Sequence, residues 1–483
     1  MKTVLLLLFA TSLACASAVY DVRDFTSCGS SDDTSAFNAE LTAIGSNNAA
    51  IQFTCRPKLS TITIPANITL DNTAGGGIYV VTGQRVTILS PMVSVPRQMF
   101  YNATAGLGTV SFSGNTAVLD FYQAWWGQGY AALQAASEAV DSTGNGGTLK
   151  LSSGHYTISA NTWTIANNTS TQHKINIIGQ GPLATYIDST VTGTTCAIYL
   201  QTLKYVELKD FSLNGSGIGN GEGICMGTAE TTGTGTNGDV FTNIIAQNFS
   251  NCVQSTGGEG TSSEITFISP QFNNCTNGFY NANYNGLDFN FYQLQMANNT
   301  VGINCATAGC NVYGGSASGN GTDFSFGNGG EFVISGFRSE TAGLFLTTAN
   351  AATGATVTSV NGVQVQSVTG NYAILVGPGS LTISNSNIGA PIEIVNDTAV
   401  LSLKNNNIAD PSNTYTATAT PEYMGPGFRM IAGSQGAIFE STNNTMVNTS
   451  FVKRGSWPSG IGTVVDDASY APIAPMGNYG QSR

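Results

Sequence analysis

The segments IIAQNFSNC (residues 244–252) and FISPQFNNC (residues 267–275) open a pattern that repeats along the middle of the chain. Units of the same length follow: FYQLQMANN from Phe291, YGGSASGNG from Tyr313 and VISGFRSET from Val333. Each unit joins a short alternating strand to a polar turn, with a period of about 20 to 24 residues. A period of this size, with short strands and no helical leucines, predicts a solenoid of the parallel β-helix type.

The repeat also predicts a stack of asparagines. Asn251, Asn274, Asn298 and Asn320 fall at one position of successive units. Amides in such a row can bond to one another along the stack, about 4.8 Å per rung. We interpret this row as structural.

The cysteine content indicates disulfides. Nine cysteines are present, and Cys15 lies in the N-terminal apolar segment, which leaves eight. An even number in a secreted chain favours disulfides over metal ligands. The column after the asparagine row contains Cys252 and Cys275, and Cys196 with Cys225 forms a similar pair. The remaining pairs follow by elimination: Cys28 with Cys55, and Cys305 with Cys310.

The N-terminus resembles a secretory signal. Lys2 precedes an apolar core, and small residues at 16–18 fit a cleavage site, so residues 1–18 are predicted to be a signal peptide. No later run is long and apolar enough to predict a membrane span. We therefore expect a secreted, extracellular protein.

The charge pattern limits the partners. Charged residues make up 9% of 483 residues, the net charge is −12 and the pI is about 4.5. An acidic chain is a poor partner for nucleic acid, whose phosphates need a basic surface. It is also a poor partner for strongly anionic glycans unless a cation bridges the two.

Two segments in the N-terminal half share one arrangement. GSSDDTSAFNAELTAIG starts at Gly29, and QAWWGQGYAALQAASEAV starts at Gln123 and is followed by GNGGTLKLSSGHYTIS from Gly144. Each places a short amphipathic helix before a β-run. This arrangement resembles the entry motif of the pectate-lyase superfamily, in which a helix caps the first coil of a right-handed parallel β-helix.

The resemblance implies the fold and leaves the activity open. The motif set of polygalacturonases and the Arg-among-Asp grouping of Ca²⁺-dependent pectate lyases are not found. By the same comparison, Asp32 and Asp33 are predicted to cap a helix. Trp125 and Trp126 are predicted to pack in a solenoid cap rather than to stack on sugar.

The predicted organisation has four parts. After the signal peptide, residues 19–126 form a β-rich entry region and residues 127–414 the parallel β-helix. Residues 415–483 lose the clear repeat and are predicted to be an irregular cover or tail.

Strand alternation selects the candidate catalytic residues. Apolar side chains at 265, 267, 289 and 291 are predicted to face inward, which places Glu264 and Asp288 in one outward column on neighbouring coils. Two carboxylates about 5 Å apart repel each other, so one should have a raised pKa. Such a pair suits acid/base or nucleophilic cleavage of a glycoside, near the spacing of retaining enzymes. The alternative is a Ca²⁺ site completed by carbonyls.

The residues predicted to contact substrate have polar or aromatic side chains and lie near this column or follow it in the sequence. They are Tyr284, Asn290, Tyr292, Arg338 and Glu340. The sequence therefore predicts a secreted enzyme that cleaves a polysaccharide, hydrolase favoured over lyase, with Ca²⁺ as the one cofactor considered. A non-catalytic glycan-binding adhesin or structural β-helix is the alternative. The oligomeric state is not predicted.

Overall fold

The computed structural model describes residues 18–29, 31–166, 173–201, 205–226, 236–256, 262–284, 286–349, 356–370, 372–390, 392–396 and 399–409, and the segments 422–425, 428–431, 438–442, 444–447 and 463–466. The predicted signal peptide, except its last residue, and most of the predicted C-terminal tail lie outside these residues. The chain forms two compact units. The first contains residues 1–119 and 124–127, and the second contains residues 120–123 and 128–483.

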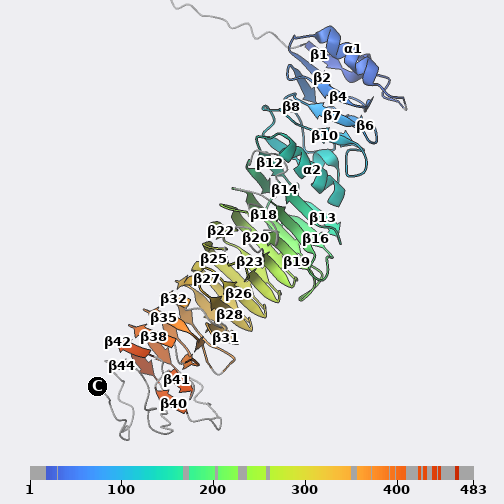
Figure 1. The fold of residues 1–483 in the computed structure, drawn as a ribbon. Helices are drawn as coiled ribbons and strands as arrows, with labels where there is room; N and C mark the ends of the chain where they lie inside the picture. The colour runs from blue at the N-terminus through green and yellow to red at the C-terminus, as the bar shows by residue number, and fades with distance from the viewer. Residues whose placement is uncertain are drawn as a thin grey trace, which may run out of the picture. The chain divides into compact units, whose positions relative to one another are not determined.

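The first unit is itself a short parallel solenoid (Figure 1). Its sheets are β1 (Ala18–Asp21), β2 (Ala49–Gln52), β5 (Ile68–Asp71) and β8 (Met92–Val93); β4 (Ile62–Ile64), β7 (Arg85–Ile88) and β10 (Thr109–Ser111); and β3 (Lys58–Leu59), β6 (Ile78–Val80) and β9 (Phe100–Tyr101). The 3-10 helix η1 (Val22–Asp24) and helix α1 (Thr34–Ile44) complete it. Phe37 of α1 stacks on Phe53, with ring centroids 6.4 Å apart, and so buries the apolar face of the helix.

The acidic pair before α1 is structural. Asp33 stands at the N-cap position, but its carboxylate accepts hydrogen bonds from Ser27 and from the backbone N–H of Lys58. Asp32 accepts one from the backbone N–H of Thr34 at 2.9 Å. Hydrogen bonds from Ser60 and then Thr34 lower the pKa of Asp32. Asp32 therefore bonds the first N–H of the helix, whereas Asp33 makes no side-chain capping bond and instead ties the helix start to Ser27 and Lys58.

The tryptophan pair is also a packing feature. Trp125 and Trp126 belong to the 3-10 helix η2 (Gln123–Trp126), and their side chains are buried. Both rings contact Phe100 of the first unit, with centroids 6.2 Å and 5.1 Å away. The prediction of packing instead of an exposed sugar platform is confirmed.

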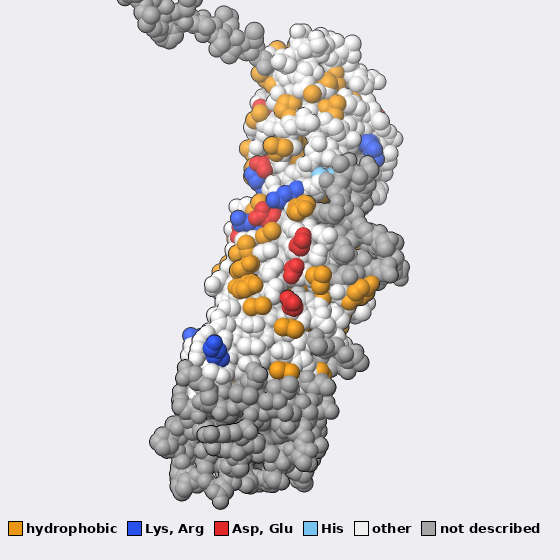
Figure 2. All heavy atoms as spheres, turned by 60° about the vertical axis from the view of Figure 1, so that its left-hand side comes forward, with side chains coloured by type: hydrophobic (Ala, Val, Ile, Leu, Met, Phe, Trp, Pro, Cys, Tyr) orange, Lys and Arg blue, Asp and Glu red, His pale blue; other side chains and the backbone are white. Residues whose placement is uncertain are grey.

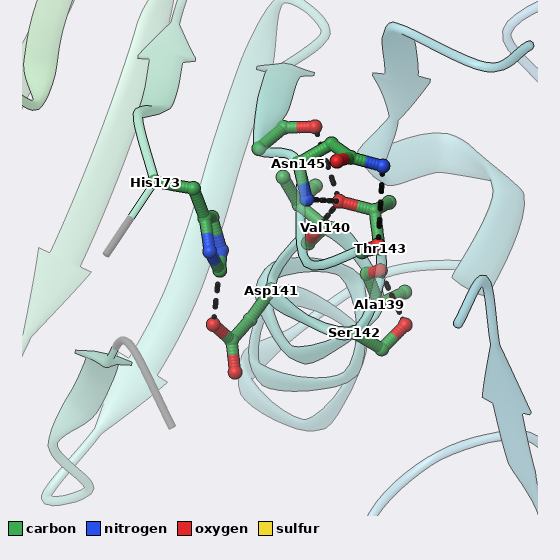
Figure 3. A network of polar contacts seen from close by, with 8 residues as sticks. Ala139, Val140, Asp141, Ser142, Thr143, Asn145 and His173 are labelled. Atoms are coloured by element: carbon green, nitrogen blue, oxygen red, sulfur yellow. Dashed lines mark hydrogen bonds and ion pairs between the residues drawn. The ribbon is translucent and has the colours of Figure 1, made fainter. Parts of the chain in front are cut away.

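In the second unit, helix α2 (Tyr130–Ser142) packs against the first coil strands β12 (Gly147–Lys150), β13 (Gly154–Ser159) and β14 (Trp163–Ala166). Figure 3 shows how its end is held. The Thr143 hydroxyl donates to the Val140 carbonyl at 2.9 Å and accepts from the Asn145 N–H at 3.1 Å. The buried pair His173 and Asp141, 3.1 Å apart, ties the last turn of α2 to the segment before β15 (Ile175–Ile178).

Each coil of this unit has three strand segments, two of which lie in a 22-stranded sheet on either side of a bend. The segments before the bend are β11 (Asp120–Tyr122), β12 (Gly147–Lys150), β15 (Ile175–Ile178), β22 (Ile265–Ile268), β29 (Glu331–Ser335), β32 (Thr356–Asn361), β35 (Gly379–Ser384), β38 (Ala399–Lys404), β42 (Ile438–Thr442) and β44 (Thr463–Asp466). Those after it are β13 (Gly154–Ser159), β16 (Thr185–Ser189), β23 (Gln271–Asn273), β30 (Arg338–Glu340), β33 (Gln364–Val365), β36 (Asn387–Ile388), β39 (Asn407–Ala409) and β43 (Thr445–Val447). Four strands run through the bend: β18 (Glu207–Asn214), β20 (Val240–Gln247), β25 (Phe289–Ala297) and β27 (Cys310–Ser318).

The third segments form a 12-stranded sheet. Its strands are β14 (Trp163–Ala166), β17 (Cys196–Gln201), β19 (Glu222–Met226), β21 (Asn251–Ser255), β24 (Asn277–Asn281), β26 (Val301–Thr307), β28 (Thr322–Asn328), β31 (Leu344–Thr347), β34 (Ile374–Val376), β37 (Ile392–Ile394), β40 (Glu422–Gly425) and β41 (Phe428–Ile431). Apart from β40 with β41, the strand pairs of the described residues are parallel. The unit is a right-handed parallel β-helix, the hand that crossovers between parallel strands take.

A phenylalanine stack marks the register of the core. Phe241 pairs with Phe267, Phe267 with Phe291, and Phe291 with Val312, steps of 26, 24 and 21 residues. The repeat in the sequence predicts that Ile244 lies opposite Phe267. The register places Phe241 there instead, three residues earlier, because coils differ in loop length. The predicted alternation holds, since residues 265, 267, 289 and 291 are buried.

The predicted single asparagine row is wrong. Asn274 and Asn298 do share a turn column, with φ of 54° and 56°. Asn320 instead lies one column further in, where its side-chain oxygen accepts from the backbone and side-chain N–H groups of Asn299 at 2.8 and 3.1 Å. Asn251 belongs to strand β21. The amides still serve structure, but in separate columns.

The disulfides agree with the prediction. Cys252 and Cys275 are bonded, as are Cys196 and Cys225, with Cα–Cα distances of 5.9 Å in both. The pairs proposed by elimination are also present: Cys28 with Cys55, and Cys305 with Cys310. None of the helices in the described residues has the length and hydropathy that crossing a membrane requires.

Candidate functional site

Glu264 and Asp288 occupy equivalent turns at the starts of β22 and β25. Ile265 pairs with Phe289, and the N–H of Glu264 donates to the carbonyl of Leu287 at 3.0 Å. Both acidic residues have left-handed backbone conformations, φ 58° and 57°, and both are exposed. They therefore lie on neighbouring rungs of one outward column, about 4.8 Å apart along the stack.

An aromatic and amide surface adjoins this column. Tyr292 of β25 stacks on Tyr313 of β27, with centroids 5.1 Å apart and planes at 19°. Tyr292 is 41% exposed. Asn311 donates to Asn290 at 3.1 Å on the same two strands. Tyrosine rings held flat on neighbouring rungs can contact the apolar face of a sugar.

Tyr284 lies in the loop that leads to Asp288 and is 57% exposed. The buried side chain of Asn281 holds this loop. It donates to the carbonyls of Gly286 at 3.2 Å and Thr307 at 2.9 Å. Tyr284 is thus an exposed ring in the segment between β24 (Asn277–Asn281) and β25 (Phe289–Ala297).

Arg338 and Glu340 lie on a different segment. They are in β30, after the bend, where Arg338 pairs with Ser316 and Glu340 with Ser318. Their side chains form an ion pair at 2.6 Å. The structure therefore does not place them beside Glu264 and Asp288.

Figure 2 shows a face on which charged side chains are sparse amid uncharged surface.

The bend itself forms an amide-lined groove of about 710 Å³ in the C-terminal coils. Asn405 donates to Asn385 at 3.2 Å, and Asn407 donates to Asn387 at 3.2 Å, so two exposed amide ladders line the groove. Gln364 occupies the position of Asn387 on the preceding rung. Amides offer neutral donors and acceptors to hydroxyl-rich ligands.

A third polar cluster was missed from the sequence. His155 of β13 contacts Asp188 of β16, with 2.6 Å between Nδ1 and Oδ2. The two residues are 33 positions apart, and the sequence carries no local motif that joins them. The signal that could have found them is the register of the first two coils, since His155 pairs with Tyr186.

Asp239 and Asp323 are among the carboxyl groups that are buried inside the β-helix. Burial raises the pKa of Asp239 to about 7, against a hydrogen bond from the N–H of Val206. Burial likewise raises the pKa of Asp323 to about 7, against hydrogen bonds from Ser339 and Asn320. Their burial excludes contact with a polymer, so we assign them to structure.

Replacing Asp323 with Asn is expected to flatten the pH dependence of stability. Between about pH 4 and pH 7 the folded state holds the Asp323 proton and the unfolded state does not. The free energy of unfolding therefore falls by roughly 1.4 kcal/mol per pH unit in this window. Asn stays neutral and can bond both partners, so the melting temperature of Asp323→Asn should exceed that of the wild type above about pH 7.

Thermal melts of wild type and Asp323→Asn across this range of pH test the prediction, with the exposed Asp288→Asn as control. Parallel curves for Asp323→Asn and wild type would contradict it.

Metal binding stays a prediction. Within the described part of the chain, no group of three or more His, Cys, Asp and Glu side chains suits a metal ion. Glu264 and Asp288 could supply two carboxylate ligands to Ca²⁺, with backbone carbonyls and water completing the shell.

Comparison with known proteins identifies no family. No family model and no curated protein matches the chain. Among solved structures, the Dettilon tailspike protein is 12% identical, with a TM-score of 0.48, over 74% of this chain and 68% of that one. The catalytic unit of a GH87 α-1,3-glucanase from Streptomyces thermodiastaticus is 13% identical, with a TM-score of 0.41, over 76% and 71%. The surface adhesin PfbA of Streptococcus pneumoniae is 10% identical, with a TM-score of 0.34, over 88% and 91%. The fold class rests on the strand pairing of the chain itself, and its function has to be argued from its own residues.

Proposed function

We propose that this β-helix is a secreted carbohydrate-active protein that hydrolyses a polysaccharide at Glu264 and Asp288. The observation that supports the proposal most is the strand register, which puts these two exposed carboxylates on neighbouring rungs. At such a spacing one carboxyl group protonates the glycosidic oxygen and the other attacks the anomeric carbon. Tyr292, Tyr313 and Tyr284 would hold sugar rings next to the bond that is cleaved.

The charge of the face favours hydrolysis over elimination. A lyase must neutralise the carboxylate of a uronate, usually with a cation or basic side chain. Strands β22, β25 and β27 contain no Lys or Arg. The face therefore suits a neutral polysaccharide. Four disulfides and the signal-like residues 1–18 support secretion.

The test is product analysis of the purified mature protein on a panel of neutral and acidic polysaccharides, with and without Ca²⁺. We expect new reducing ends without unsaturated products. Unsaturated products would contradict hydrolysis, and a requirement for Ca²⁺ would assign the carboxylate pair to a metal.

A binding-only function is the second candidate, and the amide-lined groove at Asn385, Asn387, Asn405 and Asn407 favours it. Such a groove can bind a hydroxyl-rich polymer without cleaving it. Retention of a neutral polymer in affinity electrophoresis, with no product of any kind, would support this alternative.

Tyr292→Ala is expected to weaken polysaccharide binding about tenfold, because it removes an exposed ring from the stacked pair. If the polymer is cleaved, KM should rise with little change in kcat. Tyr280→Ala is the matched control, because Tyr280 is a half-buried tyrosine on β24 in the other sheet. Equal effects of the two changes would argue against a sugar platform at Tyr292.

A further inference from the structure

His155 is an exposed imidazole held in one orientation. Its Nδ1 lies 2.6 Å from Oδ2 of Asp188, and its side chain is 63% exposed. A carboxylate only accepts hydrogen bonds, so Nδ1 carries a proton, and in the neutral imidazole the lone pair of Nε2 is available as a base.

Neighbouring coils position this pair. The ring of Tyr186 stacks on the imidazole, with centroids 4.5 Å apart and planes at 10°. The other oxygen of Asp188 accepts from Asn214 at 2.8 Å. Asn214 in turn accepts from Gln247 at 2.9 Å. Four successive rungs thus contribute to the orientation of one imidazole.

Folding does not require this arrangement. Exposed ion pairs contribute about 0 to 1 kcal/mol to stability, and long side chains lose entropy when they are held. An oriented base whose free nitrogen faces solvent is the arrangement that general-base catalysis needs.

We propose that His155, positioned by Asp188, is the general base of a second catalytic site that hydrolyses acyl esters carried by a neutral polysaccharide. Nε2 takes a proton from a water molecule, whose oxygen attacks the ester carbonyl. The tetrahedral intermediate then breaks its bond to the sugar oxygen. This oxygen recovers the proton from Nε2, so ester and water become acid and alcohol and the imidazole is regenerated.

The surrounding side chains select an ester over a uronate. Strands β13 and β16 contain no Lys or Arg, and neither do residues 211–214 and 244–247 on the next two rungs. A uronate carboxylate would therefore find no cation on these segments, and it would meet the charge of Asp188. An ester is neutral and can accept hydrogen bonds from amides such as Asn214 and Gln247.

The test is acetate release from O-acetylated xylan by the purified mature protein. We expect His155→Ala to lower kcat at least about 100-fold. Asp188→Asn should lower kcat at least about tenfold with KM and melting temperature unchanged, which a purely structural role would not produce. Thr157→Ala is the control on the same strand, and its acetate release should equal that of the wild type. Acetate release that is absent in the wild type, or unchanged in His155→Ala, would overturn the proposal.

The assumption that a polysaccharide carries the ester rests on the proposed function, but ester hydrolysis is measured separately from cleavage of the polymer. Ester hydrolysis releases acetate and creates no reducing ends. Acetate release without new reducing ends would support the role of His155 and Asp188 and would contradict polysaccharide hydrolysis at Glu264 and Asp288. New reducing ends without acetate release would support polysaccharide hydrolysis and would overturn the proposed role of His155 and Asp188.

Discussion

Glu264→Gln and Asp288→Asn are each expected to lower polysaccharide cleavage at least about 100-fold in kcat. Each change keeps the size of the side chain but removes a group that can transfer a proton or attack the anomeric carbon. Because the two carboxyl groups act in one reaction, the double variant should be little worse than the more damaged single one. Initial rates of reducing-end formation, with KM measured alongside, provide the test.

Glu331→Gln is the matched control for this pair. Glu331 is exposed and lies in the same turn column, but Gly309 separates its rung from that of Asp288. It is therefore about two rung spacings away from Asp288, too far to share a glycosidic bond with it in the retaining geometry. An equal loss in all three variants would indicate a general effect of surface charge and would remove the catalytic assignment.

Phe267→Ala is expected to cost about 3 to 5 kcal/mol of the free energy of unfolding. The Phe267 ring is buried between Phe241 and Phe291, with centroids 4.6 and 4.7 Å away, and it meets Phe279 edge-on at 5.8 Å. Removing it leaves a cavity between the rings of the two neighbouring coils, and each coil depends on its neighbours to cover its apolar face. Denaturant unfolding, monitored by the signal of the β-sheet, measures the loss.

The control for the core is Ile268→Ala, one residue further along the same strand. Ile268 points outward and is 39% exposed. Its truncation should change stability by about 0.5 kcal/mol or less, as is usual for surface positions. A loss of under 1 kcal/mol for Phe267→Ala would mean that the coils close around the gap.

Local patterns in the sequence determined the class of the fold and the facing of its strands. The period of the repeat and the alternation at 264–268 and 288–292 require only neighbours along the chain, because strand side chains alternate between faces. The disulfide between Cys252 and Cys275 was predicted from a shared column, but Cys252 lies in β21 and Cys275 lies in the turn before β24. The column of Glu264 and Asp288 was predictable because both residues stand directly before equivalent phenylalanine- or isoleucine-led strands.

Only the tertiary structure decided the register over several coils. Steps of 26, 24 and 21 residues show that loops of unequal length shift the alignment, which split the predicted asparagine row. Arg338 lies after the bend because the strand of its coil before the bend ends at Ser335. His155 and Asp188 meet because the register places Tyr186 opposite His155, and Asp188 lies two residues further along the same strand. Stacking is a long-range pairing of backbones, and the length of each loop is set by its own turn geometry rather than by any periodic signal.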